Sequence, residues 1–180
     1  MSSFVYKCLG ENADLSNGRL STGFSYLDTL WQGGFLRGGV SFLSCESFEL
    51  MEKFLWDLLK AQVELNRSGV CISSCDVDYV HMKSLPIFAS DFYFVRSHHI
   101  DACLEQFYIV CRANPELIIL YEPYWLEKGE NLFFGFYKNI LDKILHTKTA
   151  LLVLQQGADE PYAHLKGRVY MEKEIICFQR

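Results

Sequence analysis

The chain has 180 residues, of which 50% are apolar and 22% charged, with a formal net charge of −5. This length suits one domain with a substantial core, and the composition excludes an intrinsically disordered chain. The acidic balance and the lack of a lysine and arginine cluster argue against a stand-alone nucleic-acid-binding protein.

Membrane and secreted classes are also disfavoured. No apolar run reaches the ~18 residues that a membrane-spanning helix needs, and residues 1–16 lack the apolar core of a signal peptide. The seven cysteines are an odd number, scattered without a C-x-x-C pair. We therefore expect free thiols, and a soluble intracellular protein that is cytoplasmic or, in a eukaryote, nuclear.

The first third of the chain predicts two helices around one buried strand. Residues 1–20 have the character of an N-terminal extension and loop, and the remainder reads as one domain. Apolar residues at helical spacing predict a short helix over 24–31, and a glycine-rich turn leads into a buried strand over 40–44. A long amphipathic helix then begins after Ser47, which suits an N-cap.

The rest of the chain alternates between strand and helix patterns. Short apolar runs predict strands over 70–73, 92–95, 117–120 and 150–154, and apolar periodicity predicts helices over 76–85, 100–111 and 133–144. The last segments, 169–171 and 175–178, predict a closing hairpin. This order implies an α/β fold with a largely parallel sheet that helices cover on both faces.

The lead-in to the long helix resembles the RecA/Rad51 recombinase superfamily. The shared residues are Ser21-Thr22-Gly23, Leu27-Asp28, Gly33-Gly34 and Arg37-Gly38, followed by a strand, a loop and a helix. The resemblance implies a RecA-like P-loop NTPase core over a single domain, 1–180. In that fold, a mostly parallel twisted sheet ends in a C-terminal antiparallel hairpin.

The phosphate loop of that family, GxxxxGK[ST], is degenerate here. Cys45 stands at its first glycine, Leu50 at its second, Met51 at its lysine and Glu52 at its hydroxyl residue. The motif needs glycines so that backbone N–H groups can approach phosphate, and a lysine to neutralise it. Glu49 and Glu52 would instead repel a polyphosphate. We expect no bound cofactor and no ordinary ATP hydrolysis.

The other positions where the family carries catalytic groups are also altered. Tyr121 stands at the magnesium-facing aspartate of the Walker B strand, with Glu122 next, and Gln156 matches a residue that senses the γ-phosphate. Cys75 falls at the water-activating glutamate, and the adjacent Asp76 suits a helix N-cap. One carboxylate without a phosphate loop makes a weak Mg²⁺ site, so we favour a structural role for Glu122 and expect neither a metal nor a catalytic residue.

Three residues are candidates for a protein interface. Trp125 and Phe134 belong to a segment that is denser in aromatics than a helix face requires, although core packing would also explain them. Glu49 lies in the degenerate phosphate loop. The loop after Gln156 is shorter than the DNA-contacting loop of the family and acidic, which predicts weak or indirect nucleic-acid binding.

These observations predict a non-catalytic RecA-like accessory protein, an interaction protein rather than an enzyme. Its partner would be a RecA-family or other DNA-repair protein, in a hetero-oligomer or homodimer acting in repair or recombination, away from membranes. The alternatives are an atypical ATP-dependent RecA/KaiC-like ATPase and a RecA-fold inhibitor of cell division. Tight binding of MgATP would favour the ATPase.

Overall fold

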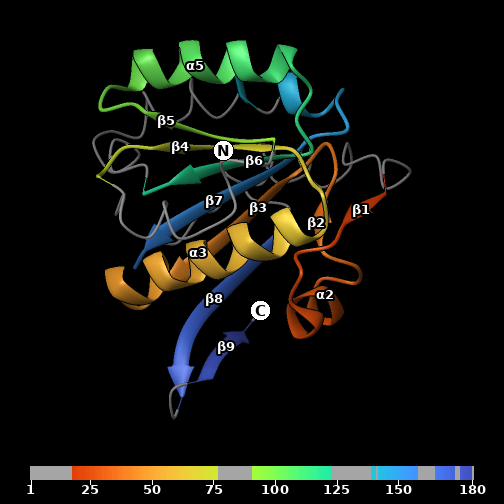
Figure 1. Ribbon diagram of the computed structural model, residues 1–180, viewed down its shortest axis with the longest axis vertical. Helices are drawn as coiled ribbons and strands as arrows, with labels where there is room; N and C mark the ends of the chain where they lie inside the picture. Colours follow the sequence, from red (N-terminus) through yellow and green to blue (C-terminus); the bar gives the residue numbers. More distant parts are fainter. Residues whose placement is uncertain are drawn as a thin grey trace, which may run out of the picture.

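A seven-stranded sheet, in the order β5-β4-β6-β7-β3-β8-β9, carries the structure (Figure 1). The computed structural model describes residues 18–76, 91–122, 139–140, 142–157, 165–172 and 175–179. Neighbouring strands from β5 to β8 are parallel, and β8 and β9 are antiparallel. The strands are β3 (Val40–Cys45), β4 (Gly69–Ser73), β5 (Phe92–Arg96), β6 (Leu117–Tyr121), β7 (Ala150–Gln156), β8 (Leu165–Glu172) and β9 (Ile175–Gln179).

Helices cover both faces of this sheet (Figure 1). One apolar cluster joins α2 (Ser25–Leu30) and α3 (Phe48–Glu64) to one face, and a second joins α5 (Ile100–Arg112) to the other. Strand β6 is apolar along its whole length because both of its faces are buried. Leu117, Ile119 and Tyr121 belong to the first cluster, whereas Ile118 and Leu120 belong to the second. The predicted α/β fold with a mostly parallel, doubly covered sheet is therefore confirmed.

Most predicted elements lie where the sequence placed them. The helix over 24–31 is α2, and the four strands after α3 extend one or two residues past their predicted bounds. The structure adds a small antiparallel pair, β1 (Arg19–Leu20) with β2 (Phe35–Leu36), and β8 begins at Leu165 rather than at 169. The predicted helix over 76–85 falls outside the described residues apart from its first position, and only part of the one over 133–144 is described, as helix at 139–140 and 142–144.

The start of α3 follows from its cap. The Ser47 hydroxyl accepts a hydrogen bond from the backbone N–H of Leu50 at 3.2 Å, which satisfies one of the unpaired donors of the first turn, as predicted. The helix buries one stripe of side chains against the sheet, comprising Leu50, Met51, Phe54, Leu55, Trp56, Leu58, Leu59 and Gln62. None of the described helices is long and apolar enough to cross a membrane.

The lead-in motif is a hydrogen-bonded turn organised by Asp28. Its Oδ1 accepts from the backbone N–H and the hydroxyl of Thr22, each at 2.7 Å, and its Oδ2 accepts from the hydroxyl of Ser21 at 2.6 Å. A charged acceptor with three donors is among the stronger hydrogen-bonding arrangements in proteins. The carboxylate therefore fixes the turn at 21–23 to helix α2.

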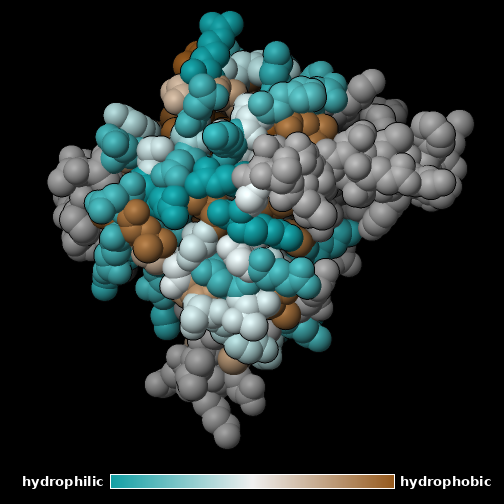
Figure 2. All heavy atoms as spheres, turned by 90° about the vertical axis from the view of Figure 1, so that its right-hand side faces the viewer, coloured by the Kyte–Doolittle hydropathy of each residue, from teal (hydrophilic) through white to brown (hydrophobic). Residues whose placement is uncertain are grey.

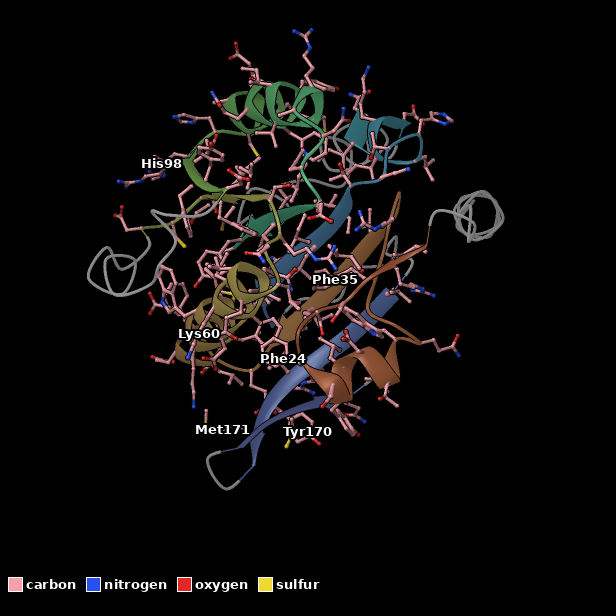
Figure 3. All side chains as sticks on the ribbon, turned by 45° about the vertical axis from the view of Figure 1, so that its right-hand side comes forward. Phe24, Phe35, Lys60, His98, Tyr170 and Met171 are labelled. Carbon is pink, nitrogen blue, oxygen red and sulfur yellow. The ribbon has the colours of Figure 1, made fainter. Side chains whose placement is uncertain are left out.

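The same turn is packed tightly against α3. A Cβ on Gly23, whose φ is 84°, would lie 2.4 Å from the Cβ of Ala61. The buried side-chain amide of Gln62 donates to the carbonyls of Ser21 and Thr22 at 3.2 and 2.9 Å. Phe24 stacks on Phe54 of α3, with ring centroids 5.2 Å apart, and lies between the two helices in Figure 3. The turn thus joins α2 to α3.

Cys45, Cys71 and Cys103 are free thiols, and all three are buried in the two cores. Cys103 of α5 is fully buried in the second apolar cluster. Burial raises the pKa of its thiol from 9.0 to about 12, because the thiolate would lose its hydration. The folded protein therefore keeps the Cys103 proton at a pH where the unfolded chain releases it.

We expect the substitution Asp28→Ala to lower the free energy of unfolding by about 3 kcal/mol, because it leaves the donors of Ser21 and Thr22 without their charged acceptor. Urea unfolding measures the loss. Asp57, exposed on α3, provides the matched control, and Asp57→Ala should change stability by less than about 0.5 kcal/mol. Equal stability of the two variants would contradict the role of Asp28.

We expect the protein to lose stability between pH 8 and pH 10, because unfolding releases protons that buried thiols retain. For Cys103 alone, the protonated fraction of an unfolded-state thiol with a pKa of 9.0 falls about tenfold over this interval, which corresponds to about 1.4 kcal/mol. Urea unfolding at both pH values should therefore show a smaller loss in Cys103→Ala than in the wild type. An equal loss in both proteins would show that Cys103 does not contribute.

Candidate functional site

The carboxyl ends of the parallel strands meet at the edge on the left of Figure 1, where α/β proteins bind their ligands. Strand register places Cys45, at the end of β3, opposite Gln156 of β7. It also places Tyr121, the last residue of β6, between Ser73 of β4 and Leu154 of β7. The structure therefore brings the predicted phosphate-loop, Walker B and sensor positions to one edge.

The connection between β3 and α3 consists of only two residues, Glu46 and Ser47. Leu50 and Met51, at the second glycine and lysine positions of the family loop, already lie inside the helix, and both are buried. Their backbone N–H groups donate to the Ser47 hydroxyl and carbonyl at 3.2 and 3.0 Å. A phosphate-binding loop presents such N–H groups outward, and here they are already paired.

Tyr121 fills the position of the magnesium-facing aspartate with a buried aromatic ring. Only 1% of the residue is exposed, and its ring packs against Phe48 with centroids 6.3 Å apart. Burial raises the pKa of its hydroxyl, and the nearby groups of Cys75 and Glu52 act in the same direction. The two positions that hold Mg²⁺ in the family that the sequence resembles thus carry a carboxylate, Glu52, and an aromatic ring, Tyr121. The Tyr121 hydroxyl has no hydrogen-bond partner among the described residues.

Glu122 is held by the backbone of neighbouring strands. Its N–H donates to the carbonyl of Leu154 at 2.8 Å, and its carbonyl accepts a hydrogen bond from the Ser74 hydroxyl. Its carboxylate accepts from the N–H of Gln156 at 3.0 Å. The φ angle of 44° is unusual for a residue with a side chain and costs of order 1 kcal/mol. These contacts tie Glu122, just after β6, to β7 and to Ser74.

Cys75 lies in the same group but is poorly suited to catalysis. Burial raises the pKa of its thiol, and Glu122 and Glu52 add to the rise, whereas a hydrogen bond with Ser73 lowers it. The thiol is therefore protonated at neutral pH, and a protonated thiol is neither a general base nor an effective nucleophile. The helix for which Asp76 was the predicted N-cap lies outside the described residues. The Asp76 carboxylate forms an ion pair with Arg96 at 2.6 Å.

The described residues at this edge do not form a metal site. His98, labelled in Figure 3, places its Nδ1 3.0 Å from the carbonyl of Ser74. Across the described part of the chain, no three His, Cys, Asp or Glu side chains gather in a way that could hold a metal ion.

The interface candidates divide into two groups. Glu49 is exposed in the first turn of α3, next to the exposed Glu46. Trp125 and Phe134 lie outside the described residues, as does the acidic loop at 158–164. The sequence analysis did not identify Phe48 as part of the site, because the phosphate-loop motif leaves that position open to any residue.

Comparison with solved structures finds a similar fold in the KaiC-like protein of the hyperthermophilic archaeon Pyrococcus horikoshii OT3. The two structures superpose with a TM-score of 0.63 and 16% sequence identity, over 89% of this chain and 85% of that chain. No family model matches the sequence, and the search of curated proteins gave no significant match. At this identity the likeness establishes the fold alone, and the chain has the RecA-like α/β fold of that KaiC-like protein.

Proposed function

We propose that this chain is a non-catalytic RecA-like protein that acts by binding a protein partner. The observation that carries the proposal is the two-residue connection between β3 and α3, which leaves Leu50 and Met51 buried inside the helix. Phosphate binding at this position needs open backbone N–H groups and a nearby cation, and the paired N–H groups and the buried methionine supply neither.

The charges around the connection support the same proposal. Glu46 and Glu49 are exposed, Glu46 forms an ion pair with Arg168 at 3.6 Å, and Glu52 and Glu122 add to the rise that burial causes in the pKa of Cys75 and Tyr121. A unit charge about 4 Å from a like charge is repelled by ~1 kcal/mol even at the dielectric constant of water, and more strongly near protein. Several carboxylates would therefore oppose the approach of a triphosphate.

The partner that we propose is a RecA-family or other DNA-repair protein, in a hetero-oligomer or a homodimer. RecA-type subunits pair across the face that carries the phosphate loop, so the exposed Glu49 belongs to the surface where a partner would lie. A role in repair or recombination would then depend on this contact. Direct DNA binding would be weak, because phosphate contacts dominate such affinity and the chain has a net charge of −5.

An ATP-dependent enzyme with an atypical site is the second candidate. The observation that favours it is the carboxylate of Glu122, held beside Gln156 at the edge where RecA-type enzymes bind nucleotide. Without a phosphate loop, however, one carboxylate gives Mg²⁺ few ligands of the kind it uses in nucleotide sites. Binding of MgATP distinguishes the two candidates.

We expect MgATP to leave the melting temperature unchanged and to release phosphate no faster than buffer does. A ligand that binds the folded state raises the melting temperature, so an unchanged value reports the absence of binding. Thermal unfolding and a phosphate-release assay measure the two quantities, with an active RecA-family ATPase as the positive control. A rise of several degrees that Ser47→Glu abolishes would place ATP at the start of α3 and support the enzyme.

We expect Glu49→Lys to weaken partner capture at least tenfold, which corresponds to about 1.4 kcal/mol. Its melting temperature should change little, because the side chain is exposed. Purified RecA-family proteins of the native host serve as baits. Glu64, exposed at the other end of α3, is the matched control, and Glu64→Lys should bind like the wild type.

The outcome against this proposal is equal capture of the two variants by every bait that binds, or no capture of the wild type by any bait. Trp125→Ala and Phe134→Ala extend the same assay to the aromatic candidates. Loss of capture without loss of melting temperature identifies an interface anchor, and a joint loss identifies a core residue.

A further inference from the structure

A cavity of about 470 Å³ lies at the opposite edge of the sheet, where the strands begin. Its lining residues come from the segments that precede three adjacent strands: Arg37 before β3, Asn114 and Glu116 before β6, and His146, Lys148 and Thr149 before β7. Figure 2 shows this edge of the molecule, across which hydrophilic side chains predominate. The volume is within the range of small-molecule sites in proteins.

Arg37 is fixed in place at the side of the cavity. One guanidinium nitrogen donates to the carbonyl of Lys148 at 3.0 Å, and the other donates to the carboxylate of Glu116 at 2.9 Å. A second arginine, Arg67, reaches the same carboxylate oxygen at 2.6 Å. Burial raises the pKa of Glu116, but the two arginines outweigh this effect and hold it below its usual value. The carboxylate is therefore ionised, and two cations share it.

The threonine hydroxyls that line the cavity already donate to backbone carbonyls, and the lining side chains that can still donate to a ligand include Asn114 and Lys148. The Thr149 hydroxyl donates to the carbonyl of Pro115 at 2.7 Å, and the Thr147 hydroxyl donates to the carbonyl of Ile144 at 2.9 Å. Lys148 is exposed, and its ammonium group forms no ion pair within the part of the chain that the structure describes. A ligand that matches these donors must present acceptors.

The formal charges around the cavity sum to a positive value. Arg37, Arg67 and Lys148 contribute three positive charges, and Glu116 contributes one negative charge. The carboxyl end of α5 adds about half a negative charge, but Arg112 in the last turn of that helix offsets it. This edge is locally positive in a protein whose net charge is −5, and a charged recess concentrates the field on a ligand of opposite sign.

We propose that this cavity binds a small anion, a molecule bearing a phosphate or carboxylate group, between Lys148, His146 and the fixed guanidinium of Arg37. The site is separate from the carboxyl-end edge, so the proposal stands whether or not the protein acts through a partner. Arg37 and Lys148 would neutralise the ligand, and Arg37 would do so with little loss of side-chain entropy because its position is already set.

The test is isothermal titration of the full chain with two probes, inorganic pyrophosphate and citrate, at low salt. We expect saturable one-to-one binding of at least one probe, and the stronger probe identifies the preferred group. The double variant His146→Ala, Lys148→Ala should weaken binding at least tenfold. The matched control is the double variant Lys60→Ala, His98→Ala, which removes the same types of side chain at positions that do not line the cavity.

A substitution that is expected to tighten binding strengthens the test. Glu116→Gln removes the only carboxylate among the lining residues and should tighten binding several-fold, whereas a merely structural role of Glu116 would weaken it. Thermal melting checks that every variant folds. The proposal is overturned if neither probe binds saturably, if both double variants lose binding equally, or if a folded Glu116→Gln variant binds more weakly than the wild type.

Discussion

The carboxylate of Asp28 is the contact on which the arrangement of the first half of the chain depends. It accepts three hydrogen bonds from the turn at 21–23. The carbonyls of the same turn accept hydrogen bonds from the side-chain amide of Gln62 in α3. Gly34 shares the constraint, because a Cβ there would lie 2.2 Å from the carbonyl of Leu20 and 2.9 Å from Oδ1 of Asp28. The lead-in therefore has a structural function of its own, and its presence does not require nucleotide chemistry at the strand end.

Much of the fold was predictable because it rests on local patterns. The apolar run of β6 and the Ser47 cap of α3 each follow from residues that are adjacent in sequence. The pair β1 and β2 was not predictable, since two residues show no period, and its partners are separated by α2. The contact between Phe48 and Tyr121 was also not predictable, because it depends on how α3 lies over β6. The cavity was not predictable either, because its lining comes from three segments that are distant in sequence. The order of the strands in the sheet brings these segments together.

The two edges of the sheet differ in electrostatic character. At the carboxyl ends, Glu52 and Glu122 act on the thiol of Cys75 and oppose its ionisation. At the amino ends, Arg37 and Arg67 surround Glu116 and lower the pKa of its carboxyl. In the common pattern of α/β proteins, the carboxyl ends bind anions with the help of helix N-termini. Here the carboxyl-end edge carries glutamates and the amino-end edge carries arginines. The amino-end edge is therefore the more favourable place for an anion.

The full burial of Met51 also bears on how this sequence can evolve. A lysine introduced there would bring an ammonium group into an apolar cluster, where its desolvation is costly and its pKa falls. A glycine at position 50 would leave a cavity on the buried side of α3. Each step toward a phosphate loop thus passes through a less stable protein, unless α3 begins later at the same time. The buried stripe of α3 therefore opposes a return to a phosphate loop at positions 50 and 51.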